Sequence, residues 1–138
     1  MKRKRPTNWR EWRVMNSKNK GCRGERLLAK ELQKYGVDAH RTAQFKGSAD
    51  SPDVVGLEGI HIECKFYKDP LTWAQKEQFM QQAVRDSEGK NIPVVFHKAN
   101  RKEWEVTLRS YLTGGESEKV LMTMRLSDFM KFYGGWHG

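Results

Sequence analysis

The sequence contains few of the residues that form covalent cross-links or soft-metal sites. Cysteine occurs only twice, at Cys22 and Cys64, and neither residue belongs to a paired-ligand motif. Two cysteines cannot build a disulfide framework, and they do not support a zinc finger. The four histidines show no metalloprotease-like spacing. Any metal site must therefore consist mostly of carboxylates, which favours Mg²⁺, with Mn²⁺ as its substitute.

Long apolar runs are missing as well. No segment approaches the roughly 18 residues of a membrane span. The basic N-terminal residues lead into Trp9–Val14 without the apolar core of a signal peptide. We therefore expect a cytoplasmic protein without a membrane partner. Its 138 residues suffice for one domain with a hydrophobic core, but hardly for two.

Basic residues, by contrast, are abundant. The formal net charge is +9 and the isoelectric point lies near 9.7. Such a surplus is typical of proteins that bind a polyanion, and a basic protein without a nucleic-acid role is the alternative. Residues 1–20 form a basic N-terminal arm that contains Lys2, Arg3, Lys4, Arg5, Arg10, Arg13, Lys18 and Lys20.

Three aromatic or apolar residues interrupt this arm at helical spacing. Trp9, Trp12 and Met15 recur at i, i+3 and i+6, so a short helix would place them on one broad side. The arm would then dock on the domain, on a second subunit or on DNA, and the three alternatives have equal weight. Arg10 and Arg13 are its candidate DNA contacts.

The remaining residues, 21–138, predict one α/β domain. Apolar spacing and turn residues predict helices over Gly24–Tyr35, Thr72–Ser87 and Leu126–Tyr133. Thr72 is the expected cap of the second helix, whose inward residues would include Phe79, Ala83 and Val84. The sequence predicts strands over Val37–Thr42, Asp53–Leu57, Ile60–Phe66, Pro93–Lys98, Glu103–Leu108 and Val120–Arg125, with a tight turn at Glu58-Gly59 and a polar loop over Tyr111–Glu118. This order indicates a sandwich in which helices cover a central mixed β-sheet. Trp104 is expected in the core or in a dimer contact.

The stretch from Ile60 to Phe66 carries the most specific signal. Strand alternation puts Glu63 and Lys65 side by side on one face. If the hairpin turns about Glu58, Asp53 lies directly opposite Glu63 and both carboxylates share that face. A strictly two-residue turn would shift the register by one residue and would require a bulge near Asp53.

Two carboxylates beside an ammonium group fit phosphodiester hydrolysis. The carboxylates would hold a divalent ion, and the lysine would offset the charge of the attacking hydroxide and of the transition state. A surface ladder of salt bridges is the alternative for this Glu-x-Lys pattern. Glu25 favours the site, because it falls on the apolar stripe of its helix and needs a cationic partner there. That partner is either a metal held by Asp53 and Glu63, or Arg41 in a structural ion pair.

An ordered set of motifs resembles the PD-(D/E)xK nuclease superfamily. The set comprises Gly24-Glu25-Arg26, Arg41, Pro52-Asp53-Val54 and Ile62-Glu63-Cys64-Lys65. It looks closest to archaeal-type Holliday junction resolvases and to small phage and prophage nucleases. The resemblance implies a restriction-endonuclease-like α-β-β-β-α-β core in a bacterial or phage-infected cell. It also implies Mg²⁺-dependent hydrolysis that leaves a 5′-phosphate, and a homodimer that acts on branched DNA.

The resemblance also assigns roles to individual residues. Asp53 and Glu63 would be metal ligands together with the Cys64 carbonyl, and Lys65 would be the catalytic lysine. Glu25 would be the helix-borne acid, acting on the metal directly or through water. Gln82 matches a glutamine often found beside such sites, with an exposed helix glutamine as the alternative. Asp50 is a second acid in the preceding loop, but Asp53 is favoured because it enters the strand.

Several further residues are candidate DNA contacts. Ser48 lies in the loop before Asp53, where related resolvases carry a serine near the scissile phosphate, and an ordinary loop serine is the alternative. Arg41 and Lys98 would contact phosphates, whereas His61 is expected to pack beside the ligand strand. The leading hypothesis is thus a structure-selective endonuclease. A nicking, flap or restriction-like nuclease is the second, and a non-catalytic nucleic-acid-binding protein is the third.

Overall fold

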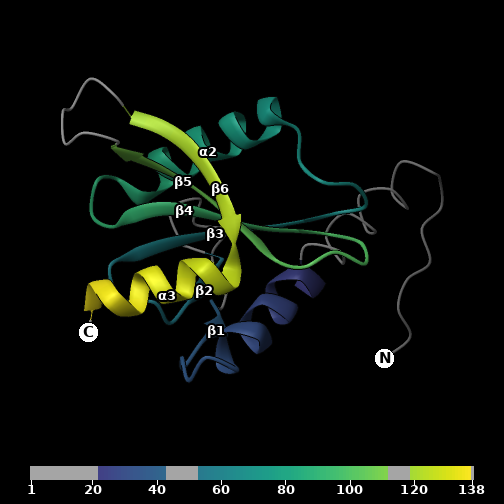
Figure 1. Cartoon of the computed structure of the whole chain (residues 1–138), viewed down its shortest axis with the longest axis vertical. Helices are drawn as coiled ribbons and strands as arrows, with labels where there is room; N and C mark the ends of the chain where they lie inside the picture. The colour runs from purple at the N-terminus through teal and green to yellow at the C-terminus, as the bar shows by residue number, and fades with distance from the viewer. Residues whose placement is uncertain (1–21, 43–52, 112–118, 138) are drawn as a thin grey trace, which may run out of the picture.

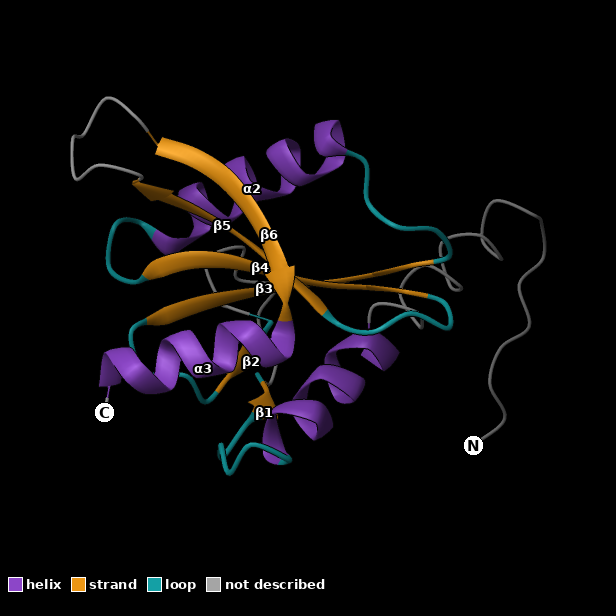
Figure 2. Cartoon of the chain, in the orientation of Figure 1, coloured by secondary structure: helices purple, strands orange, loops and turns teal. Residues whose placement is uncertain are grey.

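A six-stranded mixed sheet with helices on both faces forms the fold (Figures 1 and 2). The computed structural model describes residues 22–42, 53–111 and 119–137. Its helices cover residues 22–33, α2 (Trp73–Ser87) and α3 (Leu126–His137). Its strands are β1 (His40–Arg41), β2 (Val54–Val55), β3 (Ile60–Tyr67), β4 (Ile92–Ala99), β5 (Glu105–Tyr111) and β6 (Lys119–Arg125). The predicted helix-covered mixed sheet is confirmed.

The strands lie in the sheet in their sequence order, from β1 to β6. All neighbours are antiparallel except β3 and β4, which run parallel and are joined by α2. This one crossover puts α2 alone on one face of the sheet, while the 22–33 helix and α3 cover the other (Figure 2). Among the described residues, no helix is both long and apolar enough to cross a membrane.

Two apolar clusters hold these layers together. The larger one joins the 22–33 helix and α3 to the sheet, through residues such as Leu28, Ile62 and Phe96. Phe96 meets Phe129 of α3 edge-on, with ring centroids 5.5 Å apart. On the opposite face, Met80 and Ala83 of α2 pack on Val95. The face beneath α2 therefore has a small apolar core and leaves room for polar side chains.

Local signals explain the bounds of α2. The Thr72 side chain accepts a hydrogen bond from the Gln75 N–H, and the Gln75 side chain accepts one from the Thr72 N–H. This capping box confirms Thr72 as the predicted cap. The expectation that Val84 points inward is wrong, because its exposed fraction is 41%. The buried stripe of α2 instead consists of Met80, Ala83 and Ser87.

The first two strands are shorter than predicted. The strands expected over Val37–Thr42 and Asp53–Leu57 contain only two residues each in the structure. Gly56 explains part of this difference, because its φ of +138° is not strand geometry and it lies tightly against Asp38 and Ala39. The predicted turn at Glu58-Gly59 is confirmed, since the Ile60 N–H donates to the Leu57 carbonyl across it.

Strand β5, by contrast, extends further at its C-terminal end than predicted. This strand begins at Glu105 rather than Glu103 and continues to Tyr111, where a loop was expected to begin. Pairing with β6 explains the extension, because the ladder between the two strands runs as far as Tyr111 opposite Lys119. Trp104, predicted to be in the core or a dimer contact, has an exposed fraction of 6% and belongs to the main core.

Gly24 allows the 22–33 helix to approach β3 closely. A Cβ atom at this position would lie 2.7 Å from the Phe66 Cβ, which is well inside normal contact distance. We predict that Gly24→Ala lowers the free energy of unfolding by about 1–3 kcal/mol, because the helix must move away from the strand. Urea unfolding followed by circular dichroism measures the effect.

Gly134 provides a matched control for this substitution. It also lies in a helix, but a Cβ atom there would meet no atom within 4 Å. Gly134→Ala should therefore leave stability unchanged or raise it by up to about 1 kcal/mol through helix propensity. Equal losses in the two variants would contradict the close-approach explanation.

Candidate active site

The register of β2 and β3 brings two predicted site residues together. Val54 pairs with Ile62, so position 53 faces position 63. The turn is the two-residue one at Glu58-Gly59, so the β2 side holds one extra residue, and the bulge that such a turn requires lies at Gly56, whose φ is +138°. The Asp53 N–H donates to the Ile62 carbonyl at 3.0 Å. In return, the Cys64 N–H donates to the Asp53 Oδ2 at 2.8 Å. These two hydrogen bonds fix Asp53 against β3, next to Glu63.

The two carboxylates at these positions lie in a region of limited hydration. The exposed fraction of Glu63 is 3% and Asp53 is partly buried. Burial first, and then the negative charge of Glu63, raise the pKa of Asp53 to about 7, although the Cys64 N–H and Lys65 act in the opposite direction. Paired anionic groups of this kind are stabilised by a proton or by a cation. The arrangement therefore has the electrostatic character of a cation site.

Lys65 lies on the same face of β3 and is held by α2. Its ammonium donates to the Gln82 Oε1 at 3.4 Å and lies 4.7 Å from the centre of the Phe79 ring. The Phe79 ring in turn stacks on Tyr67 with centroids 5.7 Å apart. Of the two readings of Gln82, the structure therefore favours a partly buried residue beside the site over an exposed helix residue.

His97 is an uncharged neighbour of this lysine. It pairs with Lys65 across the parallel ladder of β3 and β4, and its ring hydrogen-bonds the Thr107 hydroxyl at 2.7 Å. Burial lowers the pKa of His97 to about 4, with a further contribution from the charge of Lys76. At neutral pH, His97 thus adds no positive charge next to Lys65.

Glu25 and Arg41 form an ion pair beside this centre. The Arg41 Nε donates to the Glu25 Oε2 at 2.8 Å, and the Arg41 Nη2 contacts the Cys22 thiol at 3.2 Å. The hydrogen bond to Glu25 is the main reason why the pKa of Arg41 is raised. The buried position predicted for Glu25 is confirmed, with an exposed fraction of 8%. Its charge also raises the pKa of Asp53, so Glu25 lies within electrostatic reach of the site.

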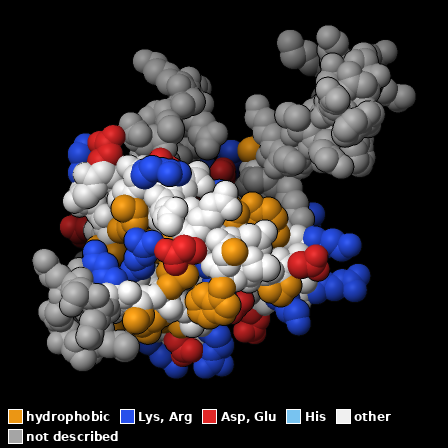
Figure 3. All heavy atoms as spheres, turned by 90° about the horizontal axis from the view of Figure 1, so that it is seen from above, with side chains coloured by type: hydrophobic (Ala, Val, Ile, Leu, Met, Phe, Trp, Pro, Cys, Tyr) orange, Lys and Arg blue, Asp and Glu red, His pale blue; other side chains and the backbone are white. Residues whose placement is uncertain are grey.

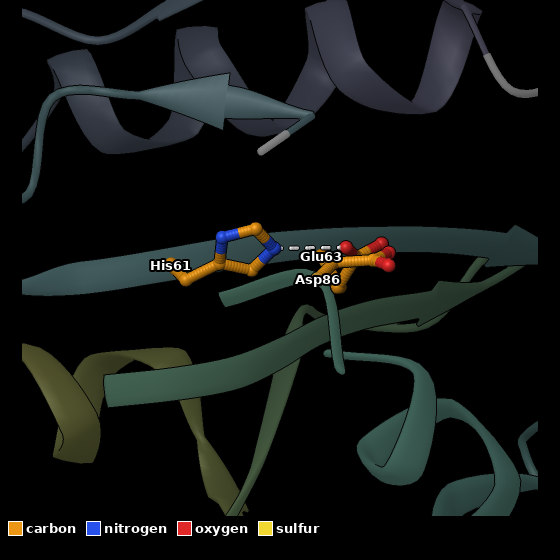
Figure 4. A group of neighbouring side chains, drawn as sticks. All are labelled: His61, Glu63 and Asp86. Atoms are coloured by element: carbon orange, nitrogen blue, oxygen red, sulfur yellow. Dashed lines mark hydrogen bonds and ion pairs between the residues drawn. The ribbon is translucent and has the colours of Figure 1, made fainter. Parts of the chain in front are cut away.

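The sequence did not single out Asp86, which completes a second group of ligand atoms around Glu63. The His61 Nε2 lies 3.0 Å from the Glu63 Oε1, and one oxygen of Asp86 belongs to the same group (Figure 4). Asp86 comes from α2, four residues after Gln82, and this spacing puts both residues on one helix face. That spacing links Asp86 to Gln82, but it points to the site only once Gln82 is known to face the sheet. His61 packs beside the ligand strand as expected, with an exposed fraction of 3%.

Of the predicted DNA contacts that the structure describes, Arg41 lies beside the site with Glu25, and Lys98 does not. Lys98 is the ladder partner of Phe66 and lies over its ring at 5.5 Å, on the sheet face opposite Glu63 and Lys65. Its ammonium donates to the Ala99 carbonyl. Ser48, Arg10 and Arg13 lie outside the described residues, as does the alternative acid Asp50. Their roles stay predictions.

Surface charge on the α2 side of the described domain is mixed. Lysine and arginine side chains lie among acidic and apolar ones on the face drawn in Figure 3. Residues 1–20 hold eight basic residues and one acidic residue, and thus carry +7 of the formal +9. Most of the excess charge therefore belongs to the arm, outside the described residues.

Comparisons with known proteins agree with the motif pattern and the fold. The model of a family described as "Phage putative PDDEXK endonuclease" matches residues 16–129. Among solved structures, the chain is similar to Hjc, a Holliday junction resolvase from the archaeal hyperthermophile Archaeoglobus fulgidus. The TM-score is 0.51 at 24% identity, over 81% of this chain and 96% of that one. No curated protein sequence matches as a relative.

Proposed function

Because the chain belongs to the phage PD-(D/E)xK endonuclease family, we propose that it is a divalent-cation-dependent endonuclease that hydrolyses phosphodiester bonds of branched DNA. The observation that carries this proposal is the position of Asp53 opposite Glu63, with Lys65 on the same sheet face. A surface salt-bridge ladder does not fit this arrangement, because Glu63 is buried and Lys65 is bonded to Gln82 rather than to an acid.

The donor set fits Mg²⁺ or Mn²⁺. Asp53 and Glu63 offer hard carboxylate oxygens, which these ions prefer. Burial and the negative charge of Glu63 raise the pKa of Asp53, so a bound cation would stabilise the ionised pair. The Cys64 carbonyl is the proposed third protein ligand. When bound, a divalent cation would supply Lewis acidity, polarising the scissile phosphate and making water a stronger acid.

The other residues of the site would orient and neutralise the substrate. We assign to Lys65 the stabilisation of the negative charge that grows on the phosphate as water attacks. Gln82 and Phe79 hold its ammonium on the side of the site that faces α2. The Glu25–Arg41 pair places one more carboxylate within reach of Asp53, and Glu25 would act on the cation through water.

The reaction is a hydrolysis that breaks one bond of the DNA backbone. Water forms a new bond to phosphorus, the bond from phosphorus to the 3′ oxygen breaks, and that oxygen takes up a proton. The products are a 5′-phosphate and a 3′-hydroxyl.

Branched DNA is the proposed substrate class. The support is the similarity to Hjc, a Holliday junction resolvase, together with the strongly basic composition of the chain. Resolution of a four-way junction requires two cuts, so we propose that the protein acts as a homodimer with one site in each subunit. Arg10, Arg13, Arg41 and Ser48 are its proposed phosphate contacts, whereas Lys98 lies on the opposite face of the sheet, away from the phosphate that would be cut.

A comparison of four DNA substrates tests this proposal. A four-way junction, a flap, a Y-fork and a linear duplex of matched sequence are each incubated with the protein, in Mg²⁺ or in EDTA. We expect cleavage only with Mg²⁺ and fastest on the junction. Equal rates on the linear duplex would favour a nicking or restriction-like nuclease. Binding without cleavage of any substrate in Mg²⁺ or Mn²⁺ would instead favour the non-catalytic alternative.

A further inference from the structure

A second group of ligand atoms lies next to the proposed cation site. The His61 Nε2 and one carboxylate oxygen each from Glu63 and Asp86 all lie within 4.8 Å of one another. Figure 4 shows the three side chains meeting at one point, with the His61 ring and the Glu63 carboxylate joined by a hydrogen bond of 3.0 Å. Two atoms that each lie 2.0–2.2 Å from one ion must be within about 4.4 Å of each other, and the His61–Glu63 distance of 3.0 Å meets this condition.

The group is built into the fold rather than lying loosely on its surface. His61 and Glu63 are alternate residues of β3 and each has an exposed fraction of 3%. Asp86 belongs to α2, which packs over the same face of the sheet, and it is partly exposed. Strand β3 therefore positions the ligand atoms of His61 and Glu63, and the partly exposed Asp86 would supply the third ligand from α2.

The acidic side chains of this group lie close together. Carboxylate oxygens of Glu63 and Asp86 are within 4.8 Å of each other. Among the ion pairs between described residues, neither acid has a lysine or arginine partner. One cation between Asp53 and Glu63 would leave Asp86 with the longer-range charge of Arg85 but no ion-pair partner among these residues.

We infer that His61, Glu63 and Asp86 form a second divalent-cation site, which selects Mn²⁺, Co²⁺ or Zn²⁺ over Mg²⁺ and shares Glu63 with the first. The selectivity follows from the imidazole nitrogen, which suits transition metals, whereas Mg²⁺ prefers oxygen ligands. The inference rests on the proposed function only in taking Glu63 as a ligand of the first site. Its ligands His61 and Asp86 lie outside the motifs that define the first site.

Cobalt absorption tests the second site without any DNA. Full-length protein in excess Mg²⁺ is titrated with Co²⁺, and its visible ligand-field bands are recorded. We expect saturable bands with one Co²⁺ per chain. Asp86→Asn and His61→Gln should each weaken Co²⁺ binding by at least about tenfold, because each removes a protein ligand. Asp53→Asn should retain the bands, since Asp53 is not a ligand of the second site.

Two controls make the result decisive. Asp38→Asn makes the same chemical change at an exposed residue and should bind Co²⁺ like the wild type. If the His61→Gln variant does not fold because its site is buried, Co²⁺ binding by Asp86→Asn alone tests the inference. The inference is overturned if the wild type gives no saturable bands, or if Asp86→Asn binds Co²⁺ as the wild type does. Junction cleavage in Mg²⁺ alone is scored separately, so a failure of the nuclease proposal is distinguishable.

Discussion

Replacing Asp53 with asparagine (Asp53→Asn) is expected to slow Mg²⁺-dependent junction cleavage by at least about 10²–10³-fold, the scale of losing one group that stabilises the transition state. The substitution preserves the size of the side chain and leaves an oxygen able to accept the Cys64 N–H. It removes one of the two carboxylate charges that would hold the proposed cation, opposite Glu63. Single-turnover cleavage of a labelled four-way junction measures this loss directly.

The binding of DNA should respond differently. One anionic charge near the phosphates disappears in Asp53→Asn, so junction affinity should be retained or should increase. Asp38→Asn serves as the control with the same chemistry at an exposed position away from the site, and it should cleave at the wild-type rate. If Asp53→Asn cleaved as fast as this control, the assignment of Asp53 as a metal ligand would have to be abandoned.

The second large effect is a loss of stability in the metal-free protein as the pH rises. The folded-state pKa of Asp53 is about 7, against an ordinary value of 3.8. Between these values the folded state holds a proton that the unfolded state has released, so stability falls with increasing pH. One pKa unit corresponds to about 1.4 kcal/mol, and the change attributable to Asp53 is therefore at most about 4 kcal/mol. Above about pH 7 this contribution becomes constant.

Urea unfolding at about pH 5 and about pH 8, in EDTA, measures this dependence. The difference between wild type and Asp53→Asn isolates the contribution of Asp53 from that of other groups, and Asp53→Asn should be the more stable protein at the higher pH. Saturating Mg²⁺ should restore stability to the wild type but not to this variant. If the stability of the wild type and of Asp53→Asn depended on pH in the same way, the pKa of Asp53 would not be raised in the folded state.

The central part of the site could be predicted because it depends on local geometry. Strand alternation puts Glu63 and Lys65 on one face, and the turn at Glu58-Gly59 together with the bulge at Gly56 fixes which residue of β2 faces Glu63. Both features are contained in fewer than about fifteen consecutive residues, a separation over which backbone periodicity is a sound guide. The mixed sheet followed in the same way from the order of strongly patterned elements.

Contacts between distant elements could not be derived in this manner. Asp86 was missed because α2 has few apolar residues, so its sequence does not fix which side of the helix faces the sheet. The stripe of Met80, Ala83 and Ser87 becomes visible only once the helix packs. That packing turns Val84 outward and brings Asp86 to Glu63.

Glu25 illustrates a different limit. Its place on the apolar face of the helix predicted a buried acid, and this is confirmed. The sequence favoured a metal as its partner and left Arg41 as the alternative, because the choice depends on distances across the sheet. In the structure the Arg41 guanidinium reaches Glu25 from β1. The Glu25 carboxylate therefore lies close enough to act on Asp53, while its own charge is balanced by Arg41.

The claim on which the proposed function depends is that Asp53 and Glu63 together hold a divalent cation. Anomalous diffraction from crystals soaked in Mn²⁺ tests it most directly, because the signal locates the ion independently of activity. We predict a peak coordinated by one oxygen from each carboxylate, with Lys65 beside it and not bound to it. Well-ordered carboxylates that point apart, with no anomalous peak between them, would contradict the account.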